Sequence, residues 1–259
     1  AGVPDSLLKS ICAYISDHCN NDNHVITPNE GSAIALATGY HLGSGKIPLV
    51  YMQNSGLGNA INPLLSLADE EVYKIPLLLM IGWRGEPDVN DEPQHMKQGS
   101  ITTQLLDCLK IPFFILDNNE HDSLPTLKKA FERLEKLKSP VALLIKKNTF
   151  SSYSKVKTKS RLLATLKREE VLRMIIDKMP KDTFFISTTG KTSRELYEIR
   201  EDIDKCHSFD FLTVGSMGHA SSIALGIAQT APNRKIICLD GDGACLMHLG
   251  NLTTIGAQR

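Results

Sequence analysis

The chain has 259 residues, of which 42% are hydrophobic, and its 29 lysines and arginines balance 29 aspartates and glutamates. This composition is typical of globular proteins, and the length is enough for two modest domains. A net charge of zero, without a dense block of basic residues, argues against binding to nucleic acid. The longest apolar stretch, residues 75–83, is interrupted by Pro76 and Gly82 and is too short for a membrane span, so we expect no membrane segment.

The six cysteines are scattered and form no C-x-x-C pair, and most lie inside apolar runs. This placement predicts reduced, buried thiols rather than disulfides. The first residues show neither a basic region nor an apolar one that follows it, so no targeting segment is predicted. Together these features lead us to expect a cytoplasmic protein.

In chain order, the first predicted element is a helix through Leu7 and Ile15, which follows a Pro4-Asp5 start signal. Short apolar runs then alternate with helical patterns such as 124–137 and 169–178. The runs predict strands at 25–26, 49–52, 77–81, 113–116, 141–145, 184–187 and 236–239. Strands this apolar need cover on both faces, which is typical of parallel sheets in α/β proteins.

A stretch rich in Ser, Thr and Lys interrupts this alternation and predicts a linker at 148–161, although its lysines also fit a docking patch. On either side lie two predicted α/β domains, 1–147 and 162–259. The two halves resemble each other, because residues 32–36 match 221–225 and residues 46–47 match 235–236 at the same offset.

The clearest chemical signal is the turn Gly241-Asp242-Gly243 after the last predicted strand. Glycines let the main chain approach a phosphate, and an aspartate supplies the oxygen ligand that Mg²⁺ prefers. The turn is not a dinucleotide fingerprint, because Leu246 occupies the place of the third glycine, and it lacks the ending of a P-loop. An ordinary tight turn remains the alternative.

Two further loops each open a helix of small residues. Glu30 is the first acid of one such helix, where it either carries chemistry or only complements the helix dipole. The loop around Met217 opens the other, and Met217 is either a ligand contact or part of the core. Upstream of that loop, Thr189 and Gly190 lie in a segment that offers phosphate-binding donors.

Five segments resemble the phosphonopyruvate decarboxylase family of thiamine-diphosphate enzymes, which is close to sulfopyruvate decarboxylase: residues 2–8, 51–59, 82–87, 91–95 and 213–220. The strings Gln-Asn-Ser-Gly-Leu-Gly-Asn and Gly-Trp-Arg-Gly-Glu-Pro are the most specific, and the resemblance covers essentially the whole chain. It implies two similar parallel-sheet α/β domains of the thiamine-diphosphate-binding fold, with a pyrimidine-binding domain at 1–147. The diphosphate-binding domain at 162–259 is expected to be incomplete, and the chain to be truncated at both ends.

The resemblance also implies roles for single residues. Glu30 is the catalytic acid that bonds to N1′ of the cofactor's aminopyrimidine ring, and Asp242 is the one Mg²⁺ ligand that we can name. The residues expected to bind the cofactor are Glu30, Asn54, Thr189, Gly190, Ser216, Met217, Gly218, His219, Gly241, Asp242 and Gly243.

For the substrate, the planar guanidinium of Arg84 suits a tetrahedral oxyanion, and Gln98 lies in the same segment. An alternative is that Arg84 only pairs with Glu86. His95 is the second expected catalytic residue, which orients the substrate or relays a proton.

The implied reaction is the decarboxylation of 3-phosphonopyruvate to phosphonoacetaldehyde and CO₂ by a homo-oligomer with thiamine diphosphate and Mg²⁺ at the subunit interface. The alternatives are a sulfopyruvate decarboxylase and a catalytically incomplete remnant with a binding or regulatory role.

Overall fold

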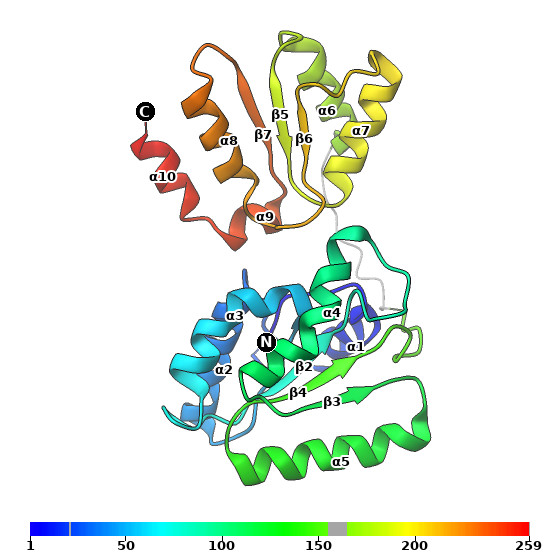
Figure 1. Ribbon diagram of the computed structural model, residues 1–259, viewed down its shortest axis with the longest axis vertical. Coiled ribbons are helices and arrows are strands. Elements are labelled where there is room, and N and C mark those ends of the chain that lie inside the picture. Colours follow the sequence, from blue (N-terminus) through cyan, green and yellow to red (C-terminus); the bar gives the residue numbers. More distant parts are fainter. Residues whose placement is uncertain (21, 155–164, 259) are drawn as a thin grey trace. The chain divides into compact units, whose positions relative to one another are not determined.

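The computed structural model describes residues 1–20, 22–154 and 165–258 (Figure 1). The chain divides into two compact units, Ala1–Thr158 and Lys159–Arg259, which we call unit 1 and unit 2. Residues 155–161 of the predicted linker lie outside the described residues, and residues 148–154 contain no helix or strand.

Unit 1 contains a four-stranded parallel sheet with the strand order β1-β2-β4-β3. The strands are β1 (Leu49–Gln53), β2 (Leu78–Gly82), β3 (Phe113–Leu116) and β4 (Val141–Ile145). The helices are α1 (Lys9–His18), α2 (Glu30–Ser44), α3 (Leu57–Pro63), α4 (Pro93–Cys108) and α5 (Glu120–Leu137). A 3₁₀ turn (Asn54–Gly56) precedes α3, and a π turn (Leu64–Ala68) follows it.

Both faces of this sheet are covered, as its apolar strands require. Successive side chains of a strand point to opposite faces, so Val50 and Met52 pack in one core and Tyr51 in the other. Helices α2, α3 and α4 close the first core, while α1 and α5 close the second. Figure 1 shows α5 running along β3 and β4. The prediction of a parallel sheet covered on both faces is confirmed.

Unit 2 contains a three-stranded parallel sheet with the order β6-β5-β7. The strands are β5 (Phe184–Ser187), β6 (Asp210–Leu212) and β7 (Ile236–Leu239). The helices are α6 (Arg168–Lys178), α7 (Lys191–Ile203), α8 (Ala220–Thr230), α9 (Asp242–Met247) and α10 (Asn251–Ala257). Helices α6 and α7 pack on one face and α8 on the other, so this unit repeats the parallel α/β plan of unit 1.

Two details of the strand prediction are wrong. Residues 25–26 form no strand, because Ile26 makes only an isolated bridge with Gly2 and its side chain is 60% exposed. Strand β6 was missed because it has three residues, begins with Asp210 and exposes Phe211, so it carries no apolar run.

The cysteine prediction holds in one respect and fails in another. All six cysteines, each of which lies in the described part of the chain, are free thiols. None of the six is fully buried, because Cys12, Cys238 and Cys245 are only half-buried. Cys19, Cys108 and Cys206 are exposed, because each lies at or beyond the end of a helix rather than on its buried face. Among the described residues, no helix combines the length and apolar character that a membrane span requires.

Candidate functional site

Glu30 is the first residue of α2 and its carboxyl group is buried. The helix begins here because the side chain of Asn29 accepts a hydrogen bond from the Ser32 amide at 2.8 Å. The Glu30 side chain, on a residue only 5% exposed, accepts a hydrogen bond at Oε2 from Asn59 Nδ2 of α3 at 2.8 Å. An acid that served only the helix dipole would not need this burial, so the position favours a chemical role.

A glycine makes room for this carboxyl group. A Cβ atom at Gly56, in the turn after β1, would overlap Oε1 and Cδ of Glu30. The sequence Asn-Ser-Gly after β1 therefore leaves the space that Glu30 occupies.

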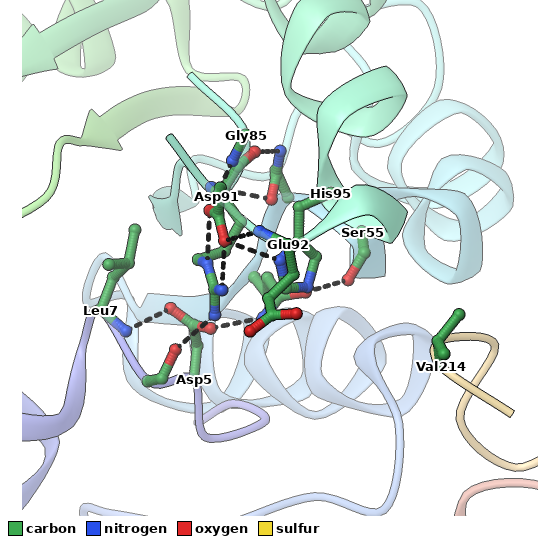
Figure 2. Close-up of polar contacts among 12 residues, drawn as sticks. Asp5, Leu7, Ser55, Gly85, Asp91, Glu92, His95 and Val214 are labelled. Atoms are coloured by element: carbon green, nitrogen blue, oxygen red, sulfur yellow. Dashed lines mark hydrogen bonds and ion pairs between the residues drawn. The ribbon is translucent and has the colours of Figure 1, made fainter. Parts of the chain in front are cut away.

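A second buried carboxylate lies at the same edge of the sheet. Asp5 accepts hydrogen bonds from the Leu7 amide at 2.9 Å and from Gln53 Nε2, at the end of β1, at 2.6 Å. Ser55 donates to the other end of the Gln53 amide at 2.6 Å (Figure 2). Sequence reasoning did not single out Asp5 as a site residue. The available signal was the segment 2–8, which carries the family resemblance and contains Asp5. In the folded unit, Gly82 at the end of β2 leaves space for Asp5, since a Cβ there would overlap Asp5 Oδ2.

Asn54 is buried and its amide group serves unit 1 itself. Nδ2 donates to the Arg84 carbonyl at 2.8 Å and to Thr102 Oγ1 at 2.9 Å, and Oδ1 accepts from the Arg84 amide at 3.1 Å. Both N–H donors are used within the unit. Asn54 thereby fixes the loop after β2 against α4, and its contact with a cofactor stays a prediction.

Asp91 joins the two residues that we expected at the substrate. Arg84 Nε donates to Asp91 Oδ2 at 2.7 Å, and Arg84 Nη2 pairs with Oδ1. His95 Nδ1, in the first turn of α4, lies 3.1 Å from Asp91 Oδ1. Figure 2 shows Asp91 between the Gly85 loop and His95.

The charge of Asp91 is strongly stabilised. The Arg84 guanidinium, aided by the Gly85 and Glu92 amides and by His95, holds the pKa of the Asp91 carboxyl well below its usual range. The same pair raises the pKa of Arg84. Sequence reasoning missed this role of Asp91, although its spacing of four residues from His95 was a signal.

The alternative partner for Arg84 is wrong. Glu86 pairs with Lys146 Nζ at 2.8 Å, whereas Arg84 pairs with Asp91 and donates from Nη1 to Ser6 Oγ at 2.8 Å. Gln98 is exposed on α4, three residues after His95 and hence on a neighbouring part of the helix surface.

In unit 2, the Gly241-Asp242-Gly243 turn lies between the end of β7 and the start of α9. Asp242 is exposed, and its Oδ1 accepts a hydrogen bond from the Gly243 amide at 2.8 Å. The described residues contain no cluster of three His, Cys, Asp or Glu side chains suited to a metal.

Close to Gly241, the structure leaves a buried hydroxyl unsatisfied. A Cβ at Gly241 would contact Thr188 Cγ2 at 3.4 Å, so the two residues are neighbours. Thr188 Oγ1 is buried and has no hydrogen-bond partner in the described part of the chain. An orphaned hydroxyl beside a glycine main chain fits an anionic oxygen ligand, and the carboxylate of Asp242 fits a hard cation such as Mg²⁺.

The loop around Met217 adopts a left-handed backbone at Ser216 (φ 53°) and Gly218 (φ 89°). This conformation leaves Met217 40% exposed, so the interpretation of Met217 as a core residue is wrong. Its Cε would lie 3.2 Å from a Cβ at Gly243, so the loop reaches the Asp242 turn. The structure thus brings two of the predicted segments together within unit 2.

The remaining predicted residues lie beside that loop. His219 Nδ1 lies 3.1 Å from Ser216 Oγ, and Thr189 Oγ1 donates to the Val214 carbonyl at 2.8 Å. Gly190 has a φ of 91° and open space around it. His248, which sequence reasoning missed, has its ring 4.5 Å from that of His219.

Comparison with known proteins gives consistent results for both units. The family model "Thiamine pyrophosphate enzyme, N-terminal TPP binding domain" matches residues 1–106, and the corresponding C-terminal TPP binding domain matches residues 189–259. Phosphonopyruvate decarboxylase of Streptomyces viridochromogenes is 34% identical over 273 residues, which cover 100% of this chain and 66% of that protein. The enzyme of the same name from Streptomyces hygroscopicus is 33% identical, with 100% and 65% covered.

Sulfopyruvate decarboxylase subunit alpha of Methanococcus maripaludis is 36% identical over 143 residues, which cover 55% of this chain and 82% of that subunit. This chain spans about two thirds of the length of the two phosphonopyruvate decarboxylases.

Proposed function

The chain belongs to the thiamine pyrophosphate enzymes, and from this premise we propose that it acts in the decarboxylation of 3-phosphonopyruvate to phosphonoacetaldehyde and CO₂. The observation that carries the proposal is the buried Glu30 carboxyl group, held by Asn59 in the space that Gly56 leaves. When bound, thiamine diphosphate supplies a nucleophilic carbon and a ring that accepts the electron pair released as CO₂ leaves.

The residues of unit 1 then have distinct tasks. Glu30 holds and moves a proton at its carboxyl oxygens, toward N1′ of the pyrimidine. Its burial keeps water from competing for that proton. His95, oriented by Asp91, relays a proton at the substrate, and Gln98 and Arg84 contribute donors to it.

The residues of unit 2 would hold the diphosphate and its cation. Gly241 and Gly243, which carry no Cβ atom, would let the diphosphate approach the turn closely, and the buried Thr188 hydroxyl would bind one of its oxygens. Asp242 would ligate Mg²⁺. The exposed Met217 and its neighbour His219 would support the cofactor rings, with Thr189 and Gly190 along the diphosphate. We further propose a homo-oligomer that binds the cofactor at the subunit interface.

Sulfopyruvate is the second candidate substrate, because a sulfopyruvate decarboxylase subunit is 36% identical over 55% of this chain. Both substrates carry a tetrahedral anion at one end and a 2-oxo acid at the other. Hydrogen-bond donors of the kind carried by Arg84, His95 and Gln98 suit either one.

The test is CO₂ release from phosphonopyruvate, sulfopyruvate and pyruvate, with and without thiamine diphosphate and Mg²⁺. We expect cofactor-dependent release that is fastest with phosphonopyruvate. Faster CO₂ release from sulfopyruvate would mean that sulfopyruvate is the substrate instead of phosphonopyruvate. No CO₂ release from any of the three compounds would contradict the proposed activity and favour a binding or regulatory remnant.

A matched variant tests Glu30. Glu30→Gln keeps the hydrogen bond to Asn59 but cannot exchange a proton. We expect CO₂ release to fall at least about 100-fold, as is typical when general acid–base catalysis is lost. Calorimetric binding of thiamine diphosphate should stay within a few-fold of wild type. Unchanged turnover would contradict the role assigned to Glu30.

A further inference from the structure

A hollow of about 390 Å³ lies beside Arg84 in unit 1. Its walls include Ser6 before α1, Lys9 and Ser10 in the first turn of α1, Trp83 and Arg84 after β2, and Lys147 after β4. A volume of this size is within the range of small-molecule sites.

The lining of the hollow carries unbalanced positive charge. Its two acids are already paired, Asp91 with Arg84 and Glu86 with Lys146. Lys9 and Lys147 also line it, and neither forms an ion pair with any residue that the structure describes. The hollow is therefore lined by two exposed lysines that have no ion-pair partner among the described residues.

Further hydrogen-bond donors accompany the two lysines. Arg84 has five N–H donors, of which three are used toward Asp91 and Ser6, so two remain. The hydroxyls of Ser6 and Ser10 also lie in the lining. A positively charged hollow with several hydrogen-bond donors suits a tetrahedral oxyanion better than a carboxylate, because the tetrahedral group has more acceptor oxygens.

A short path of neighbouring residues connects the hollow to the catalytic carboxyl group. Asp5, next to Ser6, binds Gln53 at the end of β1, and the turn that follows Gln53 reaches Gly56 and Glu30. The hollow thus lies at the same carboxyl-end edge of the sheet as Glu30, where ligands of parallel α/β sheets bind.

We propose that this hollow binds the tetrahedral anion of the substrate, and that Lys9 and Lys147 determine specificity for it. Arg84, which Asp91 already neutralises, contributes N–H donors rather than the unpaired charge. This inference rests on the proposed function, because it places the phosphonate end of that substrate.

The single tryptophan of the chain provides a direct probe. Trp83 lines the hollow and is held by a hydrogen bond from Nε1 to the Gly99 carbonyl at 2.9 Å. Its fluorescence is titrated with phosphonopyruvate, methylphosphonate, inorganic phosphate and pyruvate, in the absence of thiamine diphosphate. We expect saturable changes with the phosphonates, at least about tenfold tighter binding of phosphonopyruvate than of pyruvate, and weaker binding at high salt.

Variants locate the site. Lys9→Ala and Lys147→Ala should each weaken phosphonopyruvate binding about tenfold, the size expected for one charge-assisted hydrogen bond. Lys46→Ala is the control, because it removes one positive charge from an exposed position of unit 1 that lies outside this hollow, and its binding should match wild type. Lys9→Gln and Lys147→Gln keep most of the aliphatic stem and serve if an alanine variant fails to fold.

The outcomes are distinguishable. Wild-type binding by both lysine variants would overturn the inference, as would phosphate bound as tightly as phosphonopyruvate, which would mark a site for free phosphate. Intact phosphonate binding without CO₂ release would overturn the proposed function alone. Full CO₂ release by the lysine variants, with unchanged KM for phosphonopyruvate, would overturn this inference alone.

Discussion

Single glycines decide where two buried carboxyl groups of unit 1 lie. Gly56 leaves space for Glu30, and Gly82 leaves space for Asp5. Neither contact is visible from the acid itself, because each acid and its glycine are far apart in the sequence. The glycines matter here for their missing Cβ atom and not for their backbone freedom.

Gly56→Ala tests this arrangement. The new methyl group must displace the end of a flexible side chain, Glu30, so the protein should fold with its melting temperature lowered by only a few degrees, equivalent to about 1 kcal/mol. Cofactor-dependent CO₂ release should fall at least about tenfold, because Glu30 is moved.

Gly58→Ala is the matched control. Gly58 is two residues further, in α3, and a Cβ there meets nothing within 4 Å. This variant should keep its activity and gain about 0.5–1 kcal/mol of stability. Equal activity of the two variants would show that Gly56 does not position Glu30.

The lowered pKa of the Asp91 carboxyl group leads us to expect that the stability of the folded protein depends on pH. The pKa of Asp91 is lowered in the folded protein, chiefly by the hydrogen bond from Arg84, so its contribution to the free energy of unfolding is complete above the unfolded pKa of about 3.9. That contribution is lost only as the pH falls toward the lower, folded pKa. Asp91→Asn should therefore lower the melting temperature at pH 7.

The measurement is a series of thermal melts of wild type and Asp91→Asn from pH 7 to pH 3. The difference in melting temperature should be constant from pH 7 to about pH 5 and shrink below about pH 4. A difference that grew toward low pH would contradict the assignment of Asp91 as an ionised partner of Arg84.

At the scale of elements, one buried ion pair joins α7 to β6. Arg200 Nε and Nη2 donate to the Asp210 carboxylate at 3.0–3.3 Å, and the two side chains are 7% and 1% exposed. The Arg200 guanidinium also lies over the Phe185 ring, 5.0 Å from its centre. Because β6 has only three residues, this pair adds a second attachment to the ladder that β6 forms with β5.

Arg200→Met should destabilise unit 2 by about 3–5 kcal/mol, because it removes the hydrogen-bonded partner of the buried Asp210 carboxylate and leaves only His207, whose Nδ1 lies 3.6 Å from Oδ2. The double variant Arg200→Met/Asp210→Leu should recover much of that loss, because no charge is left buried. Urea unfolding of the singles and the double measures both values.

Arg173→Met is the control within the same unit. Its pair with Asp202 at 2.5 Å is exposed, with 46% and 63% of the two side chains accessible, so less than about 1 kcal/mol should be lost. Similar losses for Arg173→Met and Arg200→Met would refute the special weight of the buried pair.

At the scale of the whole molecule, each unit has its own sheet and its own cores. Gly99→Ala should destabilise unit 1 by about 1–3 kcal/mol or more, because its Cβ would overlap the backbone carbonyl of Gly85. Calorimetry should show Gly99→Ala and Arg200→Met acting on different transitions, and their effects should add in the double variant. If calorimetry showed a single transition that both variants shift alike, the prediction that the two units unfold separately would be wrong.

The sequence by itself determined the alternation of strands and helices in both units. The apolar runs 77–81 and 141–145 predict strands from their own composition, and the structure has strands at 78–82 and 141–145. The two residues predicted as a strand at 25–26 are too few to form a ladder. The sequence does not predict β6, because its pairing with β5 and its ion pair with α7 stabilise it and neither contact is local.

The sequence also singled out Glu30, Asp242 and the loop at Met217, because each combines a reactive or small side chain with the start of a helix. Only the tertiary structure decided which charges meet. Arg84 pairs with Asp91 and not with Glu86, and Lys9 and Lys147 line one hollow although they are far apart in the chain. The physical reason is that secondary structure follows from local patterns along the chain, whereas ion pairs and hollows form where separate strand ends and helix starts converge in space.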